Sequence, residues 1–467
     1  MTAGNEGATK RPQVVVIGGG FAGLNAAEAL SHMAVDVTLI DRRNHHTFQP
    51  LLYQVASGVL SPADIAKPIR SVLRNKHNIE VLMDEVVGFD LPEKTVHLRS
   101  GANVLFDYLI VATGSTHSYF GNDEWAKYAP GLKTVEDATE MRRRIMLAYE
   151  LAEREAVETG QQVPLTFVVV GGGPTGVELA GAIRDIASLF LHEDYTHIDT
   201  TKTRVLLVEG GPHIVPSYPP ELQEKALEQL RELGVEVMTG KVVTDVKPGY
   251  VVLGKGENAE RVDALVTLWA AGVQASPLGK MLGFPVNRKG SVIVDQFLNP
   301  PGNPNIFICG DLAQVMENGK QVPGVAQPAM QMGTQAAHMI EADLEHRPRK
   351  PFHYFDKGDM ATIGRHRAIA DVKWPFKGHL GGFLAWLTWG LVHVYFLIGF
   401  RNRLAVMFEW AWTYLTRSHG AALITGSQWL PGWDERMEHH RVTTEPIDLA
   451  SPTSEPVSGS EVKTTFS

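Results

Sequence analysis

QVVVIGGGFAGLNAAEAL, residues 13–30, places a short apolar run directly before a Gly-x-Gly-x-x-Gly fingerprint and a helix-forming segment. This order is typical of a strand buried on both faces, a tight turn and a helix. Gly18 allows the turn, Gly20 lets the backbone approach a pyrophosphate, and Gly23 lets the helix pack against the strand. The phosphates of a dinucleotide would then face the unpaired N–H groups at the helix N-terminus. The residues assigned to this predicted site are Gly18, Gly20, Phe21, Ala22 and Gly23.

The segments that follow complete the first nucleotide-binding unit. A second apolar run, 35–40, ends in Asp41, close to the ~20-residue offset expected for an acid that binds the ribose. Residues 106–114 read as a strand that ends in a glycine turn, which would close the same site. The further residues assigned to this site are Arg42, Gln49, Val86, Ala112, Thr113 and Gly114.

The same pattern recurs about 150 residues later. A strand pattern over 166–170 precedes the second fingerprint, and the strand pattern over 204–208 runs into Glu209. Glu209 would repel the 2′-phosphate of NADP but can accept hydrogen bonds from a free ribose 2′-hydroxyl, so the sequence predicts NAD rather than NADP. The residues assigned to this second site are Gly171, Gly173, Pro174, Thr175, Gly176, Glu209, Ala271 and Gly272. One chain is therefore predicted to hold two dinucleotides.

Composition excludes several classes of function. A formal net charge of −9 over 467 residues argues against a nucleic-acid partner. The single cysteine, Cys309, can form neither an intrachain disulfide nor a Cys-x-x-Cys pair, and we interpret it as an inert buried thiol. Redox chemistry must then belong to a cofactor. The loop residues His45 and His46 lack the spacing of other ligands, so no metal site is predicted.

The patterns predict an α/β fold with two Rossmann-type dinucleotide-binding domains, the second inserted in the first, and a C-terminal helical membrane-binding region. The insertion is inferred because the strand pattern over 305–313 is too short to stand alone and is expected to complete the first sheet. The predicted parts are a flexible N-terminus over 1–10, a first domain over 11–163 and 297–350, a second domain over 164–296, a membrane-associated region over 351–435 and a disordered tail over 436–467.

An apolar segment over 380–400 carries no Asp, Glu, Lys or Arg and is just long enough to span a bilayer. Basic residues flank both of its ends, which favours a segment that lies on one face of the membrane. The next run, 404–415, mixes aromatic and apolar residues with Glu409, as an interfacial helix would. Monotopic binding is the preferred interpretation, with a single transmembrane span over 380–400 and a buried core or dimer interface as alternatives.

Together these motifs resemble the two-dinucleotide-binding flavoproteins, in which FAD occupies the first Rossmann-type domain and NAD(P)H the inserted one. The Cys309-Gly310-Asp311 turn is similar to the second FAD motif of that superfamily, and the resemblance implies that Asp311 binds the ribityl hydroxyls of the flavin. Members that depend on cysteine pairs or an early redox cysteine are disfavoured by the single Cys309.

The chain up to about residue 435 more closely resembles the type II NADH:quinone oxidoreductases. The segments that carry this resemblance are 44–56, 324–331 with its Ala-Gln-x-Ala-x-Gln pattern, 386–393 and 399–403. Gln327 and Gln331 are expected on one helix face, where their amides could bond the flavin and a quinone carbonyl, with Ala326 beside them. The resemblance implies that Glu178 positions NADH at the flavin; the alternative is an acid matched to its helix dipole.

The predicted function is therefore a non-proton-pumping NADH:quinone oxidoreductase that uses FAD and NADH. A hydride would pass from NADH to FAD, followed by two-electron reduction of a membrane quinone, either ubiquinone or menaquinone. Because the first ten residues lack a secretory signal, we expect the protein on the cytoplasmic face of the cell (inner) membrane, bound peripherally to the lipid bilayer. A homodimer stays open. The alternatives are a soluble NAD(P)H:ferredoxin or rubredoxin reductase, and an FAD- and NADH-binding redox sensor.

Overall fold

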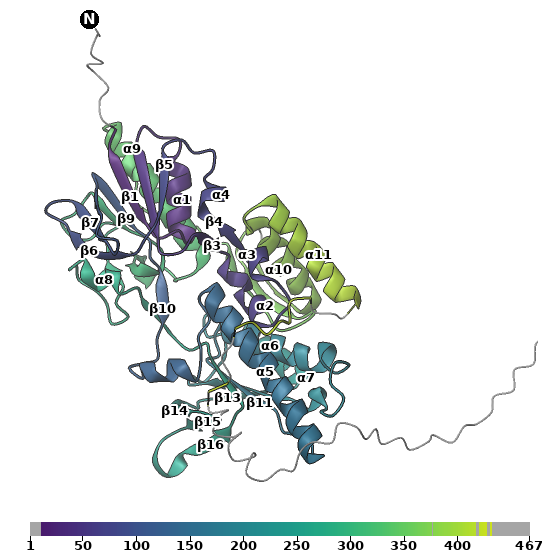
Figure 1. Ribbon diagram of the computed structural model, residues 1–467. Helices are drawn as coiled ribbons and strands as arrows, with labels where there is room; N and C mark the ends of the chain where they lie inside the picture. Colours follow the sequence, from purple (N-terminus) through teal and green to yellow (C-terminus); the bar gives the residue numbers. More distant parts are fainter. Residues whose placement is uncertain (1–10, 376, 417–419, 427–429, 432–467) are drawn as a thin grey trace, which may run out of the picture.

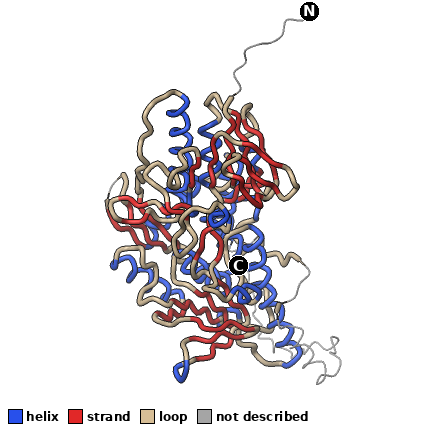
Figure 2. The backbone as a smooth tube through the Cα atoms, turned by 90° about the vertical axis from the view of Figure 1, so that its left-hand side faces the viewer, coloured by secondary structure: helices blue, strands red, loops and turns tan. Residues whose placement is uncertain are grey.

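A computed structural model describes residues 11–375, 377–416, 420–426 and 430–431 (Figure 1). The predicted flexible N-terminus, 1–10, and the predicted disordered tail, 436–467, lie outside the described residues. The chain forms two sheet-containing units, one above the other in Figure 1, with a smaller C-terminal region beside them. In Figure 2, turned by 90°, the strands of the two units again gather at opposite ends of the molecule.

The first unit is built on a five-stranded parallel sheet with the order β20-β9-β1-β2-β5. Its strands are β1 (Gln13–Ile17), β2 (Asp36–Asp41), β5 (Ile79–Met83), β9 (Tyr108–Val111) and β20 (Ile306–Ile308). β20 comes from the part of the chain that follows the second unit and pairs with β9. The predicted insertion of the second domain into the first is therefore confirmed.

Two helices of the first unit pack closely against each other, α1 (Phe21–Leu30) and α9 (Ala326–Leu344). A Cβ atom added at Gly333 would lie 2.0 Å from the carbonyl oxygen of Ala22, so only glycine permits this approach. The crossing brings the N-terminal part of α9 to the edge of the sheet where the first fingerprint lies.

The second unit repeats this plan with a parallel sheet in the order β13-β12-β11-β17. Its strands are β11 (Thr166–Val170), β12 (Arg204–Glu209), β13 (Val235–Thr239) and β17 (Val266–Trp269), and its helices are α5 (Val135–Thr159), α6 (Pro174–Asp185) and α7 (Pro220–Leu233). Each unit also contains a three-stranded antiparallel sheet. It comes directly before β9 in the first unit and directly before β17 in the second. These sheets are β6 (Val86–Asp90), β7 (Thr95–Leu98) and β8 (Asn103–Leu105), and β14 (Val243–Lys247), β15 (Tyr250–Leu253) and β16 (Glu260–Asp263).

The two units are joined by a short antiparallel pair, β10 (Ser115–His117) with β18 (Val273–Ala275). β10 runs between the upper and lower parts of the molecule (Figure 1). Several shorter elements lie outside the main sheets: β3 (His45–Thr47), α2 (Leu52–Ala56), α3 (Pro62–Ile65), β4 (Ala66–Pro68), α4 (Ile69–Val72), α8 (Leu278–Met281), β19 (Val292–Ile293), β21 (Ala313–Gln314), β22 (Met316–Glu317) and β23 (Lys320–Gln321). Among them, α2 packs against α5 and α6 of the second unit.

The C-terminal region is an antiparallel meander followed by two helices. Its elements are β24 (Gly358–Thr362), β25 (Ala368–Val372), β26 (Gly378–Gly381), α10 (Gly382–Phe396) and α11 (Phe400–Thr416). The apolar stretch 380–400 is thus divided: α10 ends at Phe396, and α11 begins at Phe400. In the described part of the chain, no helix combines the length and apolar character that crossing a membrane requires.

α11 is fixed to the first unit by polar contacts. The Asn402 amide donates hydrogen bonds to the carbonyl oxygens of Ala63 and Asp64, both at 2.9 Å and both within α3. The helix pair is therefore a docked part of the body, and one face of it is left to solvent.

Candidate functional site

Glycine occupies the three fingerprint positions of the first unit for different structural reasons. Gly18 has φ +100°, and a Cβ atom there would lie 2.5 Å from the carbonyl oxygen of Ala112. A Cβ atom at Gly23 would lie 1.8 Å from the carbonyl oxygen of Gly18. Gly20, in contrast, has extended backbone, and a Cβ atom there would meet nothing within 4 Å. Gly18 and Gly23 are thus needed for packing, whereas Gly20 leaves open space that a pyrophosphate fits.

The second fingerprint repeats each of these roles. Gly171 has φ +108° and touches Ala271, whose backbone N would lie 2.7 Å from an added Cβ atom. A Cβ atom at Gly176 would lie 1.8 Å from the carbonyl oxygen of Gly171. Gly173, like Gly20, faces open space. The loop between strand and helix therefore has the same structure in both units. In the second unit, Pro174 and Thr175 lie in the first turn of α6.

The predicted ribose acids occupy equivalent positions as well. Asp41 accepts hydrogen bonds from the backbone N–H groups of Gly19 at 2.6 Å and Arg43 at 2.7 Å. Glu209 accepts hydrogen bonds from the backbone N–H groups of Gly172 and Gly211, both at 2.6 Å. Each carboxylate keeps lone pairs for a ribose hydroxyl. It also fixes the fingerprint loop, a role that the sequence analysis missed because it depends on the loop folding back onto the next strand.

Polar atoms around the first fingerprint fit the flavin that the resemblance implies. Thr113 Oγ1, Gln327 Oε1 and His46 Nε2 are buried and have no hydrogen-bond partner among the residues that the structure describes. Thr113 lies against Gly18, and His46 contacts the carbonyl oxygen of Gly19 through Nδ1 at 3.0 Å. Buried polar groups are normally paired, and the polar edge of an isoalloxazine ring carries both donors and acceptors. The residues present therefore fit FAD.

Asp311 lies where three segments meet. It follows β20, it accepts a hydrogen bond from the Ser115 hydroxyl of β10 at 2.6 Å, and its carboxylate lies 3.8 Å from the Lys133 ammonium, just before α5. A residue at the end of the first sheet is thus tied to the link between the units. As the sequence predicted, Asp311 lies in the turn that follows β20, whereas Ser115 and Lys133 beside it were not predicted.

Glu178 belongs to a chain of side-chain contacts that connects all three parts of the molecule. Its carboxylate accepts a hydrogen bond from the Thr362 backbone N–H of β24 at 3.4 Å. The Thr362 hydroxyl is 2.9 Å from the Tyr53 hydroxyl, which also accepts from the Gln54 amide at 2.9 Å. The Trp410 indole N–H of α11 donates to Gln54 Oε1 at 2.7 Å. The second fingerprint helix is therefore linked to the apolar helices through α2.

The environment of Glu178 is strongly desolvating. Its side chain keeps some solvent contact, but the surrounding protein raises the pKa of the carboxyl group to about 8 because burial disfavours the charged form. Such a carboxyl group can hold or release a proton near neutral pH. Glu178 was predicted from the sequence; Thr362 and Trp410 were not, since no local pattern connects residues so far apart.

The two glutamines of α9 lie on one helix face, as expected, and both contact the segment that enters the C-terminal sheet. Gln327 donates to the carbonyl oxygen of Gly358 at 3.2 Å. Gln331 donates to the carbonyl oxygen of Phe355 at 3.0 Å and accepts from the N–H of Phe355 at 2.9 Å. The Gln331 amide is therefore paired on both sides with backbone, a structural contact that the sequence did not reveal, whereas Gln327 keeps its buried oxygen open.

The other predicted residues lie around the same edges of the two sheets. Ala112 is buried directly after β9, Gly114 has φ +65°, and Val86 is buried at the start of β6. Arg42 and Gln49 are exposed beyond β2 and β3. The remaining ones are Ala326, the first residue of α9, and Gly272, which has φ +79° after β17.

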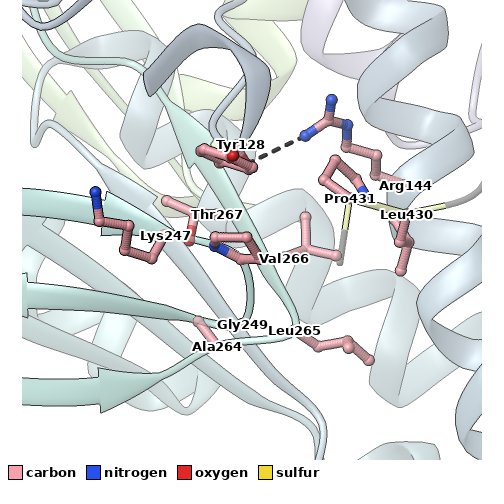
Figure 3. A pocket seen from close by; sticks show the side chains of 11 residues that line it. Tyr128, Arg144, Lys247, Gly249, Ala264, Leu265, Val266, Thr267, Leu430 and Pro431 are labelled. Atoms are coloured by element: carbon pink, nitrogen blue, oxygen red, sulfur yellow. Dashed lines mark hydrogen bonds between the residues drawn. The ribbon is translucent and has the colours of Figure 1, made fainter. Parts of the chain in front are cut away.

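A pocket lies away from these sites (Figure 3). It is lined by Tyr128, Arg144, Lys247 and Leu430 and by residues at the amino end of β17; the Arg144 guanidinium donates to the carbonyl oxygen of Tyr128 at 3.1 Å. Because β17 runs parallel to β11, this pocket opens at the edge of the sheet opposite the second fingerprint. It does not belong to the nucleotide site.

One surface of α10 and α11 is apolar, and we call it the apolar face. Its exposed side chains recur at helical spacing and are Phe383, Leu384, Leu387, Leu391 and Tyr395 on α10, and Phe400, Leu404, Met407, Phe408, Trp412 and Leu415 on α11. On the inner side the two helices meet through Trp389 and Trp410, whose ring centroids are 5.4 Å apart. An exposed apolar surface of this extent marks an interaction site.

Comparison with known proteins agrees with this geometry. A family model described as pyridine nucleotide-disulphide oxidoreductase matches residues 12–333, and one described as NDH2 C-terminal domain matches residues 357–419. Type II NADH:quinone oxidoreductase NdhA of Mycobacterium tuberculosis is 45% identical over 428 residues, which are 89% of this chain and 90% of that protein. The Ndh protein of the same organism is 43% identical over 430 residues, covering 90% of this chain and 91% of that protein.

Solved structures show the same fold. NDH2 from Plasmodium falciparum in complex with NADH superimposes with a TM-score of 0.79 at 21% identity, covering 89% of this chain and all of that one. The sulfide:quinone oxidoreductase from Aquifex aeolicus superimposes with a TM-score of 0.69 at 21% identity, covering 90% of this chain and 100% of that chain.

Proposed function

Because this chain belongs to the type II NADH:quinone oxidoreductases, we propose that it oxidises NADH with a membrane quinone as the electron acceptor. In the balanced reaction NADH, one proton and the quinone give NAD⁺ and the quinol. The observation that carries the proposal is the pair of matched fingerprint loops on one chain, joined by the Glu178–Thr362–Tyr53–Gln54–Trp410 contacts to an apolar face. Ubiquinone and menaquinone both satisfy this chemistry.

Several residues of the first unit would hold the FAD. The loop at Gly20 has room for the pyrophosphate, Asp41 offers its carboxylate to the ribose, and Asp311 to the ribityl chain. Thr113 and Gln327 offer buried, unpaired polar atoms to the ring. The chemistry that bound FAD supplies is acceptance of a hydride and release of two electrons.

The second unit would bind NADH. The loop at Gly173 has the same open space as the loop at Gly20, which supports a second pyrophosphate site. Glu209 places a negative charge where the 2′-phosphate of NADPH would lie, so it excludes NADPH by repulsion. Glu178, in the first turns of α6, would orient the nicotinamide half, and its raised pKa suits a group that holds a proton near the reacting centre.

The apolar face would rest on the lipid bilayer. Its side chains can enter the boundary between headgroups and acyl chains without a helix crossing the membrane. Basic residues beside it, among them Arg401 and Arg403, suit contact with anionic headgroups. We therefore propose monotopic binding, on the cytoplasmic face that the sequence led us to expect, where a quinone can be reached from within the bilayer.

The test uses the full chain purified in detergent. NADH oxidation is measured with a short-chain quinone and with a long-chain quinone in liposomes, for the wild type and for Leu391→Glu combined with Leu404→Glu. Leu105→Glu, an exposed leucine of β8, is the control. We expect the double variant to leave the liposomes and lose long-chain turnover while it keeps short-chain turnover. If NADH reduces the flavin and neither quinone reoxidises it, the acceptor is a protein or the chain is a redox sensor, and the proposal fails.

A further inference from the structure

Phe120 combines two features that do not serve the fold. Its side chain is 69% exposed, and its backbone has φ +54°, followed by Gly121 at φ +93°. A non-glycine residue in the left-handed region costs roughly 1–2 kcal/mol, and burial of the ring does not offset that cost here. Strain of this kind concentrates at functional sites, so the position of Phe120 calls for a reason outside packing.

The ring lies on a rigid base. Its tip, Cζ, would be 2.7 Å from a Cβ atom added at Gly272, and its centroid is 6.2 Å from the Trp269 ring. Trp269 is almost fully buried and donates from its indole N–H to the carbonyl oxygen of Ser118 at 2.9 Å. The Ser118 N–H in turn contacts the carbonyl oxygen of Gly272 at 3.3 Å. The segment that carries Phe120 is thus attached to β17 and to the turn after it through both backbone polar groups of Ser118, two residues before the ring.

That end of β17 borders the second fingerprint. Ala271, next to Gly272, touches Gly171 at the start of the fingerprint loop. In the sheet, β17 lies on one side of β11, and β12 with Glu209 lies on the other side. A dinucleotide whose pyrophosphate lies at the fingerprint has its adenosine on the side of the ribose acid and its other half on the opposite side. Phe120 therefore lies on the nicotinamide side.

We propose that Phe120 is part of the NADH site and that its exposed ring packs against the nicotinamide riboside half of NADH. The inference rests on the proposed function, and it assigns a contact to a residue that lies in no fingerprint. An aromatic face offers a flat apolar surface to a heteroaromatic ring or its ribose. With this left-handed backbone, the tip of the ring lies next to Gly272 and most of the side chain stays exposed.

The experiment compares two ligands that differ only in the half that Phe120 would touch. We measure two dissociation constants for wild type, Phe120→Ala and Phe120→Tyr. The constant for NADH comes from the dependence of the anaerobic flavin reduction rate on NADH concentration, and the constant for ADP-ribose comes from calorimetry. Leu105→Ala, which removes an equally exposed apolar side chain in the first unit, is the control. We expect Phe120→Ala to weaken the binding of NADH about three- to tenfold and to leave the binding of ADP-ribose unchanged. Phe120→Tyr and the control should keep both dissociation constants near the wild-type values.

Two results would overturn the inference. Equal weakening of NADH and ADP-ribose would mean that Phe120 supports the loop instead of touching the nicotinamide half, and an unchanged NADH constant in Phe120→Ala would mean that it makes no contact at all. Quinone reduction by the wild type is measured separately. If the wild-type flavin accepts electrons from NADH but passes none to quinone, the proposed function fails while the binding comparison still decides the role of Phe120.

Discussion

The carboxylate of Glu178 accepts a hydrogen bond from the backbone N–H of Thr362, which lies 184 residues later in the chain. This contact joins the helix of the second fingerprint to the C-terminal sheet at the point where Tyr53 of the first unit also arrives. A single, partly buried acid therefore joins the part that would bind NADH to the part that carries the apolar face. The protonation state of Glu178 should therefore affect both the stability of the fold and the reaction with NADH.

Glu178→Gln should change the pH dependence of stability. Burial raises the pKa of Glu178 from 4.5 to about 8, so the folded state favours the protonated form. The stabilisation that this raised pKa provides is complete below pH 4.5 and is lost as the pH rises through 8, with a slope of at most about 1.4 kcal/mol per pH unit. The wild-type melting temperature should therefore fall relative to that of Glu178→Gln between pH 5 and pH 9. Parallel curves for the two proteins would contradict the prediction.

Glu209→Gln should reduce the discrimination between NADH and NADPH. The glutamine removes the negative charge that opposes a 2′-phosphate but keeps one oxygen that can accept from Gly172 or Gly211. The ratio of kcat/KM for NADH to kcat/KM for NADPH should fall roughly tenfold or more, because like-charge contacts cost several kcal/mol. Steady-state rates with both nucleotides measure this ratio. A ratio equal to that of the wild type would show that another group selects the nucleotide.

Gly20→Ala and Gly173→Ala should separate the two dinucleotide sites. Both glycines have ordinary extended backbone, and a Cβ atom at either meets no protein atom within 4 Å, so both variants should fold. The added methyl group would occupy the space of the pyrophosphate. Gly20→Ala should purify with little flavin, whereas Gly173→Ala should keep its flavin and show a KM for NADH raised about tenfold. Flavin absorbance and NADH titration distinguish them, and the reverse pattern would exchange the two assignments.

Trp410→Phe should destabilise the protein although it preserves most of the ring. The change removes the indole N–H that donates to Gln54 Oε1, and this buried oxygen is left without its partner. The free energy of unfolding should fall by about 1–2 kcal/mol, measured by urea denaturation. Trp412→Phe is the matched control: its side chain is half exposed on the same helix and stacks on Phe408, so its effect should stay within about 0.5 kcal/mol.

The fingerprints could be predicted from sequence because their requirements are local. Gly18 and Gly23 meet their requirements inside one short loop, and the strand and helix on either side of that loop each show a hydrophobic pattern of their own. The contact between Gln331 and Phe355 had no such signal, since a helical glutamine pairs with backbone 24 residues away in an irregular segment. Contacts of this kind arise only when distant parts of the chain have packed.

The apolar stretch over 380–400 is a second case in which the sequence pattern did not predict the structure. Hydropathy over the stretch indicated one continuous segment, but the chain turns at Gly399, where φ is +95° and an added Cβ atom would lie 2.7 Å from Lys67 Nζ. The helix ends at the extended backbone of Leu397, and the left-handed glycine two residues later allows the turn, a local feature that an average over 20 residues does not detect. Two helices on one surface result instead of one long helix.

The pairing of β20 with β9 sets an order for synthesis on the ribosome. The second unit is continuous in the chain and can close its own sheet as soon as β17 has emerged, whereas the first sheet waits for an edge strand that is translated after the whole second unit. Asp311 and the α9 glutamine Gln327 emerge later still. Loading of the flavin should therefore be a late step in biogenesis, and nascent chains arrested before residue 306 should be able to hold nicotinamide nucleotide while remaining colourless.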